Sequence, residues 1–372
     1  MLIVPSVGKL DHCLEELLYI AENDILGDVA EEKEVDKIAS KMKETRKVKS
    51  FETLKLISQS ITFSTHALKL LSHINIHIQK PLTPKKKVRL EKMLDHIAQG
   101  LECNPSAESD QLFIFAHGLI QDSISVESLK SQEGCEIQTN RLSIRDISYK
   151  GNSTTPQGSK NSHLTAVFAL GVLHNRLKNM KLDKKDEQLL SMLDPFVSLL
   201  GDCLNSKYED VLSGFRCLAP MIKLPLPSLE AQADKIKILL LDIAQKPGNA
   251  NSLLVQSCLK LLTVLLRSTK ITLSHDQLHM LIQFPVFIDL QTNPSPVALS
   301  LLKSVVGRKI VVHEIYDVVL RVGELMVTSQ SEPIRKKCSQ ILLQFLLDYH
   351  LSDKRLQQHI DFFLTNLRQG SY

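Results

Sequence analysis

The sequence predicts an all-α protein, an α-solenoid of HEAT- or armadillo-like helical hairpins with one disordered insert. Apolar residues return at helical spacing (i, i+3, i+4, i+7) along most of the 372 residues, and period-two alternation is rare. Corresponding helices are expected to start near residues 208, 252, 294 and 333, which gives the period of about 40 residues that is typical of such repeats. Aromatic residues make up only 5% and Trp is absent, which fits stacked Leu-rich helices.

Residues 1–125 form the first predicted module, of HEAT-like helices. Apolar spacing predicts four helices in it, over 7–24, 51–79, 85–103 and 110–122. Thr83 suits the N-cap of the third helix, and Pro84 suits its first turn. Proline has no backbone N–H, and at this position an N–H would have no partner within the helix. Residues 28–50 are dense in charges of both signs and predict a solvated, partly helical segment.

Residues 126–162 are rich in Ser, Asn, Gly and other polar residues and keep no apolar stripe. A structureless segment of this length is uncommon inside a compact domain, so the sequence predicts a disordered insert. In a solenoid such an insert can loop out without breaking the stack.

Residues 163–370 form the second predicted module, and its helical pairs are the most regular. In Glu332–Tyr349 one apolar stripe runs through Ile334, Cys338 and Phe345, and Ser352–Asp353 then open a partner helix. Since one hairpin cannot bury both of its apolar faces, neighbouring hairpins are expected to stack.

Composition excludes several classes of protein. The 45 basic and 41 acidic residues leave a net charge of +4, too small for a polyanion binder by bulk charge. No run reaches the roughly 18 apolar residues of a membrane span, and the short apolar start is no signal peptide. The seven cysteines are scattered, without a C-x-x-C pair, and predict buried reduced thiols rather than disulfides or a zinc ribbon.

No catalytic signature is present. Gly158-Ser-Lys160 lacks the rest of a P-loop, and His313-Glu314 lacks the second histidine of a zinc-protease motif. The pairs His73/His77 and His275/His279 each share a helical face, but no further ligand accompanies either at a diagnostic spacing. We therefore expect no enzyme activity, no metal, no cofactor and no small-molecule substrate.

A basic cluster at the predicted start of the third helix is the strongest local charge feature; it comprises Lys85, Lys86, Lys87 and Arg89. It is a candidate nuclear import signal or RNA phosphate contact. The alternative is a solvated first helical turn, although the helix dipole disfavours cations there.

A second set of basic residues lies in or near the turns of successive repeats; it comprises Arg308, Lys309, Arg335, Lys336 and Lys337. Stacked hairpins could align these residues as a basic ridge that follows a phosphate backbone or an acidic protein. Ordinary surface charge is the alternative interpretation.

Three stretches resemble the down-regulated-in-metastasis family: Phe287-Ile-Asp-Leu-Gln-Thr-Asn293, Glu332-Pro-Ile-Arg-Lys-Lys-Cys338 and Leu2–Cys13. The resemblance covers the chain outside 126–162. It implies a piece from the C-terminal region of a far longer HEAT-repeat protein, a non-catalytic scaffold of the small-subunit processome in the nucleolus. The family supports 18S rRNA processing and ribosome biogenesis, so the implied partners are processome proteins, with pre-rRNA and small nucleolar RNA as candidates. No functional residue is carried over from the family.

Two other functions compete with this one. A HEAT-repeat nuclear transport or adaptor protein would bind other proteins, but such arrays tend to be acidic because their cargo signals are basic, and the charge here is +4. A hydrolase with an unrecognised site would need polar residues converging on a pocket, and no spacing in the sequence indicates one.

Overall fold

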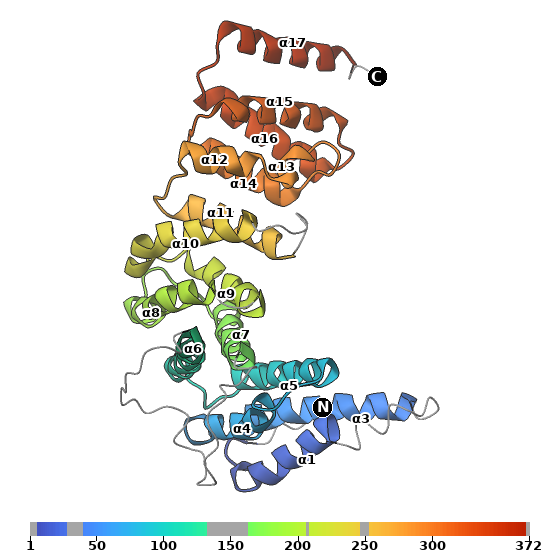
Figure 1. Cartoon of the computed structure of the whole chain (residues 1–372), viewed down its shortest axis with the longest axis vertical. Coiled ribbons are helices and arrows are strands. Elements are labelled where there is room, and N and C mark those ends of the chain that lie inside the picture. The colour runs from blue at the N-terminus through green and yellow to red at the C-terminus, as the bar shows by residue number, and fades with distance from the viewer. Residues whose placement is uncertain (1–5, 28–39, 132–162, 206–207, 246–252, 370–372) are drawn as a thin grey trace. The chain divides into compact units, whose positions relative to one another are not determined.

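The computed structural model describes residues 6–27, 40–131, 163–205, 208–245 and 253–369. Every regular element in these residues is helical and none is a strand (Figure 1). The predicted all-α class is confirmed. Contacts divide the chain into two compact units, Met1–Leu224 and Pro225–Tyr372.

Unit 1 is a stack of helices in two rows. Helices α3, α5, α7 and α9 form one row, in which each packs on the next; α6 and α8 pack on each other and cover α7 and α9. Helix α1 packs on α3, α4 and α5. The elements are η1 (Asp11–Cys13), α1 (Leu14–Leu26), α3 (Ser40–Ser60), α4 (Phe63–Ile78), α5 (Pro84–Glu102), α6 (Ser109–Ser131), α7 (His163–Asn179), α8 (Glu187–Cys203) and α9 (Tyr208–Met221).

The single helix predicted over 51–79 is in fact two, because the chain breaks between α3 and α4. Side chains from the loop after α5 bond to the backbone at this break. Asn104 Nδ2 donates to the carbonyls of Ser58 and Ile61 at 2.8 and 2.9 Å. Ser106 Oγ accepts from the Phe63 N–H at 3.0 Å. These bonds satisfy backbone groups that a continuous helix would have paired internally, so the break is stable.

Helix α6 continues through residues 126–131, past its predicted end at 122. The rest of the predicted insert, 132–162, lies outside the described residues, and so do residues 28–39 of the charged segment. Residues 40–50 of that segment begin α3. The module boundaries at 125 and 163 therefore stay a prediction; by contacts, the division falls between Leu224 and Pro225.

Unit 2 has the predicted repeat. Helices α11, α14 and α16 form one row, α12 and α15 pack together in a second, and α15 also packs on α16 (Figure 1). The elements are α10 (Pro227–Gln245), α11 (Leu253–Ser268), α12 (His275–Ile282), α13 (Pro285–Ile288), α14 (Pro296–Gly307), α15 (His313–Thr328), α16 (Glu332–Asp348) and α17 (Asp353–Gln369). The starts of α9, α11, α14 and α16 lie within two residues of the predicted 208, 252, 294 and 333.

The predicted stripe of α16 forms the core of this unit. Ile334, Cys338 and Phe345 are buried, and the ring of Phe345 packs on His359 of α17, with 6.2 Å between ring centroids. Apolar burial on the inward face of each helix is what holds the stacked pairs together.

This burial predicts a pH-dependent stability. Burial lowers the pKa of His359, while the unfolded chain keeps an ordinary histidine pKa of about 6.5. Below that value the unfolded state binds more protons, so the stability present at neutral pH falls as the pH drops. We expect His359→Gln to flatten the loss of unfolding free energy between about pH 7.5 and 5.5, by at most about 1.4 kcal/mol per pH unit.

Urea unfolding at several pH values measures this effect. His350→Gln is the matched control, because His350 lies in the turn before α17 and is exposed. If His359→Gln and the parent chain lost stability equally on acidification, His359 would not be the group that is protonated on unfolding.

Candidate interaction surfaces

The basic cluster predicted on the third helix lies in the first turn of α5. Thr83 caps this helix: its Oγ1 accepts from the Lys86 N–H at 3.3 Å, and Pro84 follows as the first residue. Lys85 is exposed, whereas Lys86 is half-buried. The cap fixes these lysines at the positive end of the helix dipole, where an anionic partner would be favoured.

The other two members of the cluster face neighbours within unit 1. Lys87 Nζ lies 3.8 Å from Glu91 Oε1, one turn along the same helix. Arg89 Nη1 donates to the carbonyl of Ile25 at 3.4 Å, near the end of α1. Arg89 therefore also links two helices of this unit.

Two of the predicted ridge residues cap helices of neighbouring repeats. Arg308 Nε donates to the Leu266 carbonyl at 2.8 Å, and its Nη2 also bonds to the carbonyls of Leu266 and Thr269, at the end of α11. Arg335 Nη1 donates to the carbonyls of Ser329 and Gln330, both at 2.9 Å, just after α15. A cation at a helix C-terminus satisfies carbonyls that lack an intrahelical partner.

The remaining ridge residues lie elsewhere on unit 2. Lys309, at φ 56°, pairs with Asp348, with 2.8 Å between Nζ and Oδ1. Lys336 is exposed, five residues into α16. Lys337 Nζ donates to Ser300 Oγ of α14 at 2.7 Å. The alignment of the five residues as one basic ridge stays a prediction.

Lys337 is near two cations that sequence reasoning missed, Arg267 and Lys303. Burial is the larger cause of the lowered pKa of Lys337, and the positive charges of Arg267 and Lys303 lower that pKa further. The signal that could have found them is the repeat itself. Arg267 bonds to Ser304, Lys303 to Gln340 and Lys337 to Ser300, and each pair is 37 residues apart.

Three of the four histidines in these pairs contact carboxylates. His73 Nδ1 lies 3.4 Å from Glu22 Oε2, and His77 bonds to the other oxygen of the same carboxylate. His279 Nδ1 lies 2.6 Å from Glu314 Oε1. Within the described ranges, no group of three or more His, Cys, Asp and Glu side chains is placed to hold a metal ion.

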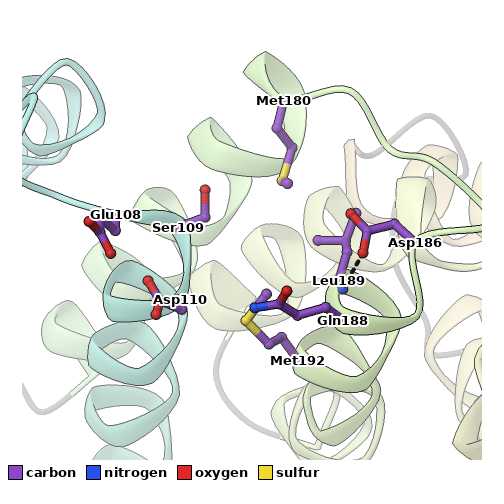
Figure 2. Close-up of a pocket in the computed structure, with 8 residues that line it drawn as sticks. All are labelled: Glu108, Ser109, Asp110, Met180, Asp186, Gln188, Leu189 and Met192. Carbon is purple, nitrogen blue, oxygen red and sulfur yellow. Dashed lines mark hydrogen bonds between the residues drawn. The ribbon is translucent and has the colours of Figure 1, made fainter.

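An open pocket of about 320 Å³ lies in unit 1, between the starts of α6 and α8 (Figure 2). Its lining comprises Glu108, Ser109, Asp110, Met180, Asp186, Gln188, Leu189 and Met192. Asp186 Oδ1 accepts from the Leu189 N–H at 3.0 Å, so this carboxylate is the N-cap of α8. These eight residues include one hydroxyl, that of Ser109, three carboxylates and no His, Lys or Cys.

The cysteines of the described residues are free, and four of them are buried: Cys203, Cys217, Cys258 and Cys338. The prediction of buried reduced thiols is confirmed for these four; Cys103 is exposed, and Cys135 lies outside the described residues. Burial raises the pKa of Cys258 to about 12 and that of Cys338 to about 11. Thiols with such pKa values stay protonated and are poor nucleophiles and metal ligands.

None of the described helices is both long enough and apolar enough to cross a bilayer.

Comparison with known proteins finds similarity along most of the chain. Residues 3–120 match the family model described as the U3 small nucleolar RNA-associated protein 20 domain. Two curated proteins named U3 small nucleolar RNA-associated protein 20 are similar over 97% of this chain, one from Schizosaccharomyces pombe (24% identical) and one from Saccharomyces cerevisiae (27% identical). The chain spans 14% of the length of each relative. The predicted family resemblance is confirmed.

Proposed function

Because the chain carries the U3 small nucleolar RNA-associated protein 20 domain and resembles proteins of that name over 97% of its length, we propose that it is a segment of a non-catalytic scaffold of the small-subunit processome. In this role it acts in the nucleolus and supports 18S pre-rRNA processing and small ribosomal subunit biogenesis. Its partners are other processome proteins, together with pre-rRNA and small nucleolar RNA. It needs no cofactor, metal or small-molecule substrate.

The single observation that carries the proposal is the similarity along nearly the whole chain. The helical repeats of each unit support it, because stacked hairpins expose long helix faces on which several partners can bind at once.

Affinity purification of the tagged full chain from nuclear extract, followed by identification of proteins and RNA, tests the function. We expect processome proteins and pre-rRNA in the eluate. Recovery of transport receptors and their cargo instead would favour the alternative, a HEAT-repeat nuclear transport or adaptor protein, and would overturn our proposal.

We also propose that Lys85, Lys86, Lys87 and Arg89 direct nuclear import or contact RNA phosphates. A fluorescent fusion of the full chain with Lys85→Gln, Lys86→Gln and Lys87→Gln should lose nuclear accumulation if the cluster is the import signal. Arg89 is left intact because it bonds to the Ile25 carbonyl.

The matched control removes three exposed lysines from the loop between α7 and α8: Lys181→Gln, Lys184→Gln and Lys185→Gln. It should enter nuclei like the parent. Equal nuclear accumulation of both variants would exclude import by the cluster and leave its contact with RNA to be tested by binding.

A further inference from the structure

The helix rows of unit 2 differ in charge. The sequences of α11 and α14 contain basic residues and neither Asp nor Glu. Helix α15, in the other row, contains Glu314, Asp317 and Glu324. In the row α11–α14–α16, the basic residues of α11 and α14 therefore have no acidic residue on their own helix to balance them.

Three cations of this row converge on α14. Arg267 of α11 donates from Nε to Ser304 Oγ at 2.8 Å and from Nη2 to the Ser300 carbonyl at 3.1 Å. Lys337 of α16 donates from Nζ to Ser300 Oγ at 2.7 Å and to the Pro296 carbonyl at 3.2 Å. Two cations from different helices thus bond to the same serine.

Lys303 of α14 is the third member, and its Nζ donates to Gln340 Oε1 at 2.7 Å. All of these partners are neutral. In the part of the chain that the structure describes, no carboxylate pairs with Arg267, Lys303 or Lys337. The packing of three helices therefore holds like charges together, an arrangement that an anion would stabilise.

We propose that Arg267, Lys303 and Lys337, the three-helix cation cluster, bind the phosphate backbone of RNA. This inference rests on the proposed function and names the part of unit 2 that would contact RNA. The guanidinium group and the two ammonium groups are donors of the kind that phosphate oxygens accept, whereas the Ser300 and Ser304 hydroxyls already donate to the carbonyls of Pro296 and Ser300.

The composition of the surface favours RNA over an acidic protein. A protein partner would be expected to bury an apolar or aromatic anchor at the centre of the contact, but the side chains that hydrogen-bond to the cluster are the polar Ser300, Ser304 and Gln340. Helices α11 and α14 contain no aromatic residue, and Phe345 of α16 is buried. Without base stacking, binding should not depend on RNA sequence.

Fluorescence anisotropy with the full chain and a labelled single-stranded RNA of mixed sequence tests the proposal. The variant is Arg267→Gln, Lys303→Gln and Lys337→Gln, which keeps hydrogen-bond donors but removes three charges. If each charge neutralises one phosphate, the slope of log K against log salt should fall by about 2, and affinity at about 0.1 M salt by about 100-fold. A second RNA of unrelated sequence should bind equally well.

The control removes equal charge from unit 1, with Lys181→Gln, Lys184→Gln and Lys185→Gln, and should change affinity less than about twofold. Circular dichroism and thermal unfolding show whether the triple variant is folded. If it is not, Lys303→Glu provides the test, because the one hydrogen bond of Lys303 is to the exposed Gln340.

Unchanged RNA affinity and salt slope in folded variants would overturn the proposal. So would loss of binding to a polyglutamate probe with RNA binding retained, which would assign the surface to an acidic protein. Neither result would contradict the proposed function, because a separate experiment tests it: identification of the proteins and RNA that the parent chain binds in nuclear extract.

Discussion

Phe345→Ala is expected to destabilise unit 2 by about 3–5 kcal/mol, the usual cost of removing a buried aromatic side chain. Phe345 is fully buried. Its ring centroid lies 5.4 Å from that of Tyr316 on α15 and 4.6 Å from that of Tyr349, which follows α16. The third neighbour is His359 on α17, so truncation leaves a cavity among three helices.

The cavity should not collapse readily, because its walls are fixed independently. Tyr349 Oη donates to the Ile310 carbonyl at 2.9 Å. The guanidinium of Arg355 stacks on the Tyr316 ring, 3.8 Å from its centroid. Walls that cannot move inward leave the full cavity, and the cost of truncation rises with the cavity volume that remains.

Urea unfolding followed by circular dichroism measures the effect, with Leu347→Ala as the matched control. Leu347 lies on the same helix but is 75% exposed, so its truncation should change stability by less than about 0.5 kcal/mol. Equal effects of the two substitutions would mean that the α15–α16–α17 core does not hold unit 2 together.

The sequence predicts the helices of unit 2 well because local and tertiary signals agree there. The apolar stripe predicted over Glu332–Tyr349 falls on α16, and the residues of that stripe are the ones buried. The break between α3 and α4 was missed for a physical reason. Its backbone groups bond to Asn104 and Ser106, more than forty residues away, while the apolar spacing runs on across the break.

The same limit applies to the basic residues. The sequence places Arg308 and Arg335 in or near turns, where a cation can face solvent or cap a helix equally well. Which of these happens depends on the carbonyls of other segments, such as Leu266 and Thr269 for Arg308. The 37-residue spacing of its bonded pairs is the trace that the three-helix cation cluster leaves along the chain. That spacing can be recognised as a contact only once the stacking of successive repeats is known.

Unit 1 offers an equally large test of packing at Gly100, on the face of α5 that meets α3. A Cβ at this position would lie 2.3 Å from the Lys55 carbonyl oxygen and 2.7 Å from Ser58 Cβ. Neither atom can move freely, since both belong to α3 and Ser58 Oγ also bonds to the Leu54 carbonyl at 2.8 Å. Gly100→Ala therefore forces two helices apart, at a cost of about 3 kcal/mol that the better helix propensity of alanine offsets by about 1 kcal/mol.

Gly118→Ala separates these two contributions. Gly118 is also inside a helix, α6, but an added Cβ would meet nothing within 4 Å. Only the propensity gain remains there, so this variant should be more stable than the parent by about 0.5–1 kcal/mol. Urea unfolding should thus give changes of opposite sign at the two glycines. Stabilisation at both would show that α3 and α5 can separate without loss, and that their close approach is not what fixes the row α3–α5–α7–α9.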